Sequence, residues 1–399
     1  MPNASENLVA VANYEWLPPF GSDFSSTYMM RYYVVWSVLG LGVLAAALVR
    51  VVRRGLRPPA GGLPPGGLFP LLLFAALLSL SLRMQRNVTD FALGTLPGVA
   101  ATASWLLPGW PRREARRPWL PAAALLLAAL AAWFGWYGYP YRAGSRRPFG
   151  FGLGRNIPVA AADYVEENGL RGNAFNTYAA GAYLVYRFYP RVRVGIDSRN
   201  DVYGPELYHR YLRALAEPDA LARMLETLDA SFVFLEWSAV PSSRILEDLG
   251  HLGWRLVYFD DSIAILLRAG GPWSALAARD GYAVLDPQRY VRMMPKIGDP
   301  DRALQEAARA VRASRGAYIA RVMQINALLA LGRAREARDE EGRILQERPP
   351  LAHIYTLLGI LHLARGEASE AARLFRRALE LSPAEPTALD GLRRATGAA

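Results

Sequence analysis

The chain has 399 residues, a formal net charge of +11 and no cysteine. Its length allows two or three domains, and the lack of cysteine excludes disulfides, thiol catalysis and thiolate metal sites. Hydrophobic residues make up 52% of the chain, which predicts a protein with both membrane and soluble parts. The arginines are scattered rather than gathered in one basic stripe, so nucleic acid is not expected as a partner.

Four apolar segments precede Tyr141, and they lie at about 33–50, 67–83, 90–108 and 119–138. Each holds roughly 17–20 mostly apolar residues, which is the length that a bilayer core requires of a helix. The sequence therefore predicts a multi-pass block of four transmembrane helices over 30–140, preceded by an outer segment over 1–29. For the short second segment, the alternative is a buried hairpin of a soluble fold.

Arginine counts predict the orientation of this block. The loops after the first and third segments are the rich ones, with Arg50, Arg53, Arg54, Arg57, Arg112, Arg113, Arg116 and Arg117. The positive-inside rule places both loops in the cytoplasm. The N-terminus and everything after Tyr141 are then expected outside a bacterial inner membrane, with the lipid bilayer as a partner. The acids expected at the outer edge are Glu15, Asp23 and Asp90.

Residues 141–156 are rich in Gly, Arg and Pro and are expected to be a linker. From 157 to 270, helical and strand patterns alternate, which predicts an extracytoplasmic α/β domain with a mostly parallel sheet. The last two strands, 254–259 and 262–268, are expected to form a hairpin that turns at Asp260 and Asp261.

Polar residues follow two of the predicted strands, where open α/β sheets bind ligands. They are Asn176 after one strand, and Asp197, Arg199, Asn200, Asp201 and Tyr203 after the next. Acids, an amide and an arginine in this arrangement can hold a sugar hydroxyl or a phosphate. The alternative is a capped turn in which Arg199 pairs with Asp197 or Asp201. His209 and His251 have no partner at ligand spacing, so no metal site is predicted.

A connector over 271–297 leads to an internal repeat over 298–399. Residues 363–371 repeat the pattern of 329–337 after one period of 34 residues, which is typical of tetratricopeptide repeats. Arg321, Gln324 and Glu341 stand where apolar residues are usual. Stacked helix pairs bury a shared core and offer a surface to a partner peptide. The alternative is a helical array that only packs on the α/β domain.

Three motifs carry a resemblance over about 13–270: Glu15-Trp16-Leu17-Pro18-Pro19, Arg86-Asn87-Val88, and Ile196-Asp197-Ser198-Arg199 with its flanking residues. With these motifs the chain resembles the C-terminal half of bacterial multi-pass glycosyltransferases of the GT-C type, related to protein mannosyltransferases, some of which end in tetratricopeptide repeats. The resemblance implies a lipid-linked sugar donor and no other cofactor. The family's catalytic acid sits in the first outer loop after the first span. Here that loop is short and basic, so no catalytic acid is carried over.

These features together predict a membrane-anchored extracytoplasmic binding or scaffold protein. It would be a truncated or split relative of the GT-C enzymes, associated with envelope glycan assembly. Its expected partners are a protein bound through the repeats and a glycan or lipid-linked sugar. The alternative is a glycosyltransferase that uses a polyprenyl-phosphate sugar at the outer membrane face. In that case Glu15, Asp23 or Asp90 would act as general base.

Overall fold

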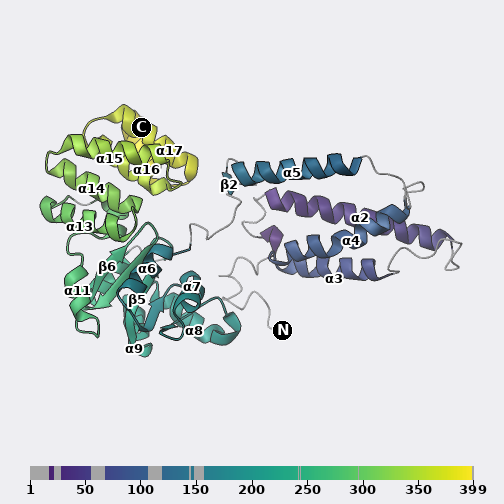
Figure 1. Ribbon diagram of the computed structural model, residues 1–399, viewed down its shortest axis with the longest axis horizontal. Helices are drawn as coiled ribbons and strands as arrows, with labels where there is room; N and C mark the ends of the chain where they lie inside the picture. The colour runs from purple at the N-terminus through teal and green to yellow at the C-terminus, as the bar shows by residue number, and fades with distance from the viewer. Residues whose placement is uncertain are drawn as a thin grey trace. The chain divides into compact units, whose positions relative to one another are not determined.

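The computed structural model describes residues 18–21, 28–54, 68–106, 119–142, 145–147, 157–240, 242, 244–294 and 296–397. The chain divides into two compact units, Met1–Gly152 and Leu153–Ala399 (Figure 1). The predicted domains over 157–270 and 298–399 both fall within the second unit.

The first unit is built from helices and one short hairpin. Its elements are η2 (Pro19–Gly21), α2 (Tyr28–Arg54), α3 (Phe69–Arg83), α4 (Asn87–Leu106), α5 (Trp119–Tyr137), β1 (Tyr139–Arg142) and β2 (Ser145–Arg147). The rings of Phe74 and Phe91 pack edge to face, with centroids 5.0 Å apart, at the centre of α2, α3 and α4. A Cβ atom at Gly40 would lie 2.3 Å from the Phe74 ring, so the close approach of α2 requires glycine there.

The prediction of a four-helix membrane block is wrong. Among the described helices, α2 over Tyr28–Arg53 is the one long and apolar enough to cross a membrane by length and composition. A buried core helix and a signal sequence near the N-terminus meet the same criterion. The helix α3 has 15 residues, about 22 Å, which falls short of a bilayer core of about 30 Å. The expected location of the C-terminal parts outside a membrane stays a prediction.

The second unit contains a five-stranded sheet in the order β4-β3-β5-β7-β6. The strands are β3 (Gly172–Asn176), β4 (Val192–Val194), β5 (Ala230–Glu236), β6 (Trp254–Phe259) and β7 (Ile263–Arg268). The strand β3 pairs in parallel with β4 and β5, whereas β7 pairs antiparallel with both β5 and β6. The prediction of a mostly parallel sheet is therefore wrong, and the sheet is mixed, because the second strand of the final hairpin adds antiparallel to β5.

Helices cover this sheet and bury its central strand. They are α6 (Val159–Glu167), α7 (Tyr178–Phe188), α8 (Asn200–Ala214), α9 (Pro218–Thr227) and α10 (Ile245–His251). Four consecutive residues of β5, Phe232 to Leu235, are fully buried. A continuous buried run of this kind requires cover on both faces of the strand. Because β3, β4 and β5 run parallel, their carboxyl ends lie along one edge of the sheet.

The rest of the unit is helical (Figure 1). Two short helices, α11 (Ser274–Asp280) and α12 (Pro287–Met293), lead into α13 (Pro300–Ala313), α14 (Tyr318–Ala330), α15 (Ala334–Glu347), α16 (Ala352–Ala364), α17 (Ala368–Leu381) and α18 (Pro386–Thr396). The helices α14 and α16 have 13 residues each and begin 34 residues apart. The helices α15 and α17 have 14 residues each and keep the same offset. Two successive helix pairs therefore share one register.

Two carboxylates connect the helical array to the rest of the unit, one to the sheet and one to the segment between α11 and α12. Asp261, in the turn between β6 and β7, accepts hydrogen bonds from the backbone N–H groups of Tyr318 (3.1 Å) and Ile319 (2.7 Å) at the start of α14. The buried carboxylate of Glu306 in α13 accepts from the N–H groups of Ala283 and Val284. Each satisfies backbone donors that would otherwise be left without partners. The sheet and the helical array are thus hydrogen-bonded within one unit.

Candidate functional site

The carboxyl edge of the parallel strands holds a closed ion pair. Asp197 follows β4, its side chain is 2% exposed, and it pairs with the largely exposed Arg199 at 2.6 Å. The hydroxyl of Tyr203 donates to the same carboxylate at 2.9 Å. Burial alone raises the pKa of Asp197, but the hydrogen bonds from Arg199 and Tyr203 outweigh it and hold that pKa below its usual range. Asp197 is therefore a buried carboxylate whose two oxygens both have partners.

The side chain of Asn176, at the end of β3, is hydrogen-bonded to the backbone that follows β4. Its Nδ2 donates to the carbonyl of Ile196 at 2.8 Å, and its Oδ1 accepts from the N–H of Gly195 at 2.9 Å. A Cβ atom at Gly181 would lie 2.1 Å from the Ile196 carbonyl. This side of α7 therefore packs directly against the backbone that precedes Asp197.

The structure brings together four of the six residues predicted at this edge. Asp197, Arg199 and Tyr203 form one hydrogen-bonded group, and Asn176 holds the backbone beside it. Asn200 and Asp201 begin α8, and their side chains lie outside the described part of the structure. The geometry is that of a capped turn, and ligand binding here stays a prediction.

The acids expected to act in catalysis do not form a site in the described residues. Asp90 is exposed in the first turn of α4. Glu15 and Asp23 lie outside the described residues.

A basic groove lies on the C-terminal helices. Its volume is about 460 Å³, and its lining is Leu345, Arg348, Tyr355, Arg373, Arg376, Arg377 and Glu380. These side chains come from α15, α16, α17 and the residue that follows α15. Four arginines against one glutamate make this groove strongly positive. Sequence reasoning predicted a partner on these helices but did not single out these residues.

Two of the groove arginines are already paired and two are not. Arg373 binds Glu370, and Arg377 binds Glu380 while its guanidinium lies 5.8 Å from the centroid of the Tyr355 ring. Arg348 and Arg376 are exposed and make no ion pair within the described part of the chain. A guanidinium group without an ion-pair partner can donate hydrogen bonds to a carboxylate without first breaking another contact.

A second, smaller basic pocket lies between α8 and α9. It has a volume of about 230 Å³ and is lined by Arg210, Arg213, Ala220, Arg223, Met224 and Thr227. This pocket is basic like the groove, but it is smaller and has no aromatic side chain in its lining. Its arginines therefore serve as matched controls for the arginines of the groove.

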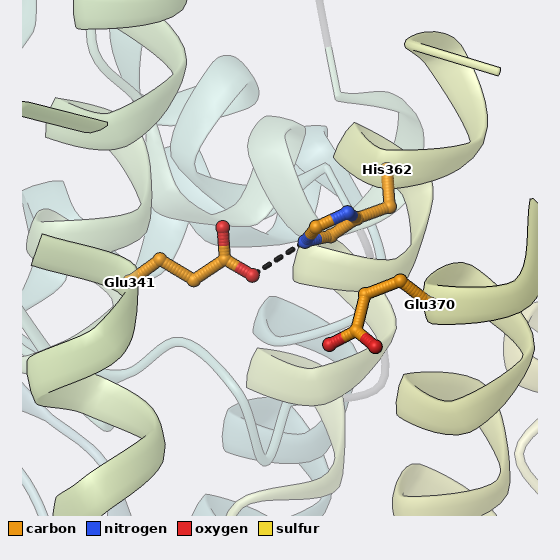
Figure 2. Close-up of side chains that lie close together, drawn as sticks. All are labelled: Glu341, His362 and Glu370. Carbon is orange, nitrogen blue, oxygen red and sulfur yellow. Dashed lines mark hydrogen bonds and ion pairs between the residues drawn. The ribbon is translucent and has the colours of Figure 1, made fainter. Parts of the chain in front are cut away.

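A buried polar cluster lies between three of the same helices. Figure 2 shows Glu341 of α15, His362 of α16 and Glu370 of α17. Nε2 of His362 is 2.5 Å from a carboxylate oxygen of Glu341, and Nδ1 is 2.5 Å from Glu367. Burial lowers the pKa of His362, but the hydrogen bond and charge of Glu341 outweigh it and raise that pKa above its usual value. This cluster was not predicted, although Glu341 at a usually apolar position was the available signal.

Comparison with known proteins found one partial likeness. A segment of 149 residues, 35% of this chain, is 30% identical to the probable biofilm formation methyltransferase WspC of Pseudomonas putida. The match covers 35% of that protein, so the chain spans about a third of its length. No family model matches the chain, and no solved structure matches it. The assignments to tetratricopeptide repeats and to GT-C glycosyltransferases are therefore corrected, because neither family is found among these comparisons.

Proposed function

We propose that the chain is a binding protein whose groove on α15, α16 and α17 holds an acidic segment of a protein partner. The observation that carries the proposal is the groove itself, with four arginines, one glutamate and a volume of about 460 Å³. The methyltransferase activity in the relative's name is not part of the proposal, because the matched segment covers 35% of that protein.

The charge of the groove favours carboxylates. Guanidinium groups hold carboxylates through two parallel hydrogen bonds, and Arg348 and Arg376 are free to do so. Leu345, which is partly exposed, adds an apolar side chain to the lining. A segment that alternates acidic and apolar side chains matches both features.

The volume of the groove and the burial of the Tyr355 ring favour a peptide over nucleic acid. A volume of about 460 Å³ falls in the range of roughly 300–1,000 Å³ found for sites that hold small ligands. The groove is therefore suited to a few residues of an extended or helical segment. Single-stranded nucleic acid needs exposed aromatic faces on which bases stack, whereas Tyr355 is 3% exposed.

The direct test is binding of a fluorescein-labelled peptide of about 12 residues that alternates Glu with Leu, a length that spans a typical docking groove. Fluorescence anisotropy should show saturable binding to the full chain. Charge reversal at Arg348 and Arg376 together should weaken it by about tenfold or more, equivalent to about 1.4 kcal/mol. The matched control reverses Arg210 and Arg223, which changes net charge equally at the second pocket.

Two outcomes would reject the proposal. Equal loss of affinity in both double variants would show that net charge alone attracts the peptide. Tighter binding of a labelled oligothymidylate than of the acidic peptide, lost on the same groove substitutions, would assign the groove to nucleic acid instead.

A further inference from the structure

The buried cluster of Glu341 and His362 is not required by the packing of the helices. Both side chains are 8% exposed. The two helix pairs share one register with an offset of 34 residues, so the counterpart of Glu341 is Phe375 and that of His362 is Leu328. Phe375 and Leu328 are both buried apolar residues. The same packing is therefore achieved elsewhere without charge, and a buried pair of carboxylate and imidazole carries a desolvation cost that an apolar pair avoids.

Three potential ligand atoms converge at this point. One oxygen of Glu341, one oxygen of Glu370 and a ring nitrogen of His362 all lie within 4.8 Å of one another. They come from α15, α17 and α16 respectively, so three packed helices hold them (Figure 2). A tetrahedral Zn²⁺ ion places its nitrogen and oxygen ligands about 3.3 Å apart. Reaching that spacing requires the carboxylate of Glu370 to move from Arg373, with which it pairs, toward His362.

The far side of the imidazole supplies an independent observation. Nδ1 of His362 lies 2.5 Å from a carboxylate oxygen of Glu367, and Arg365 contacts that same carboxylate. Histidines that ligate metals characteristically donate their other ring N–H to a carboxylate, which fixes the tautomer and raises the basicity of the ligating nitrogen. Glu367 therefore directs Nε2 toward Glu341.

We propose that Glu341, His362 and Glu370 form a binding site for a divalent transition-metal ion of the Zn²⁺ class. Imidazole nitrogen and carboxylate oxygen are ligands that suit zinc, and three protein ligands leave a fourth position for water. On binding, the ion takes the place of the proton shared by Nε2 of His362 and Glu341, and that proton is released to solvent. The site adjoins the groove through the pair of Glu370 with Arg373, but Zn²⁺ binding is measured without the peptide, so the inference stands if the proposed function fails.

The test uses the full chain with any affinity tag removed, and Zn²⁺ alone as the probe. Equilibrium dialysis should give one Zn²⁺ per chain, and Co²⁺ in its place should give the visible absorption of a low-symmetry site. Glu341→Gln and His362→Leu should abolish saturable binding. Glu367→Gln should weaken it about 10–100-fold, as expected for a residue that orients a ligand.

The matched control is Glu336→Gln, because Glu336 is the counterpart of Glu370 in the preceding helix pair and is exposed beside Arg333. This variant should bind Zn²⁺ as the parent does. Circular dichroism checks that each variant keeps its helices. Should His362→Leu unfold, the nearly isosteric Glu341→Gln still decides the question. The absence of saturable Zn²⁺ binding, or binding unchanged by Glu341→Gln, would overturn the proposal and leave His362 as an imidazolium held between two glutamates.

Discussion

Nε of Arg373 lies 2.9 Å from a carboxylate oxygen of Glu370. This contact links the groove to the buried cluster, because Arg373 lines the groove and Glu370 belongs to the cluster. A cation that draws Glu370 toward His362 releases the guanidinium of Arg373. The two proposed sites are therefore expected to influence each other, and thermodynamic linkage requires the effect to be reciprocal.

The first prediction is that saturating Zn²⁺ tightens binding of the acidic peptide by roughly fivefold or more, the lower end of common coupling energies. The reason is that the guanidinium of Arg373, once released from Glu370, can bind a carboxylate of the peptide. Anisotropy titrations with and without Zn²⁺ measure the effect. Glu341→Gln, which retains the pair between Glu370 and Arg373, should show no response to Zn²⁺. Equal peptide affinities of the parent chain in both conditions would show that the sites are independent.

Asp261 is predicted to stabilise the junction between the sheet and the helices. It accepts from the N–H groups of Tyr318 and Ile319 at the start of α14. Asp261→Ala should lower the free energy of unfolding by about 1 kcal/mol, as loss of a helix cap does. Ser262→Ala, at the exposed neighbouring residue of the turn, is the control. Urea denaturation compares the two, and equal stability of both variants would argue against the cap.

The sequence located this turn but not the direction of the sheet around it. The hairpin was expected at 254–259 and 262–268, and it forms at Trp254–Phe259 and Ile263–Arg268. Its signals are local, because Asp260 and Asp261 interrupt two apolar runs. The antiparallel pairing of β7 with β5 depends instead on contacts between residues far apart in the chain. Propensity and periodicity do not contain that information.

The same limit explains the other differences. Apolar segments of roughly 17–20 residues, as counted from the sequence, suit both a bilayer and a helical core such as that around Phe74, so length and composition alone led to the membrane prediction. Glu341 and His362 lie 21 residues apart on different helices, and only packing brings them together. In contrast, Asp197 and Arg199 are close in sequence, and their pairing was among the alternatives considered from the sequence.

His353 provides a prediction about pH. Burial lowers the pKa of His353 to about 4, and its buried Nε2 has no hydrogen-bond partner among the residues that the structure describes. Below about pH 6.5 the unfolded chain takes up a proton that the folded imidazole does not, so the free energy of unfolding falls as the pH decreases from about 6.5 toward about 4. His353→Leu should reduce the loss of stability between pH 7 and pH 5 by roughly 1–2 kcal/mol. Denaturation at the two pH values measures it, and identical losses in variant and parent would contradict it.

Gly181 is predicted to be required for the edge of the sheet. A methyl group there would lie 2.1 Å from the Ile196 carbonyl, which is backbone and has little freedom to move. Gly181→Ala should cost about 1–3 kcal/mol, the usual range for overpacking. Gly250→Ala is the control, because that helical glycine has open space around it. A variant at Gly181 as stable as the one at Gly250 would show that α7 is not packed as described.

The central claim is that the groove on α15, α16 and α17 is where an acidic partner segment binds. Photo-crosslinking tests it most directly, with the Glu-Leu peptide carrying a benzophenone and mass spectrometry locating the crosslinks. Crosslinks are expected at residues that line the groove, such as Leu345, and they should disappear when Arg348 and Arg376 are both reversed to Glu. Crosslinks concentrated at the pocket of Arg210, Arg213 and Arg223, or unaffected by that double substitution, would contradict the claim.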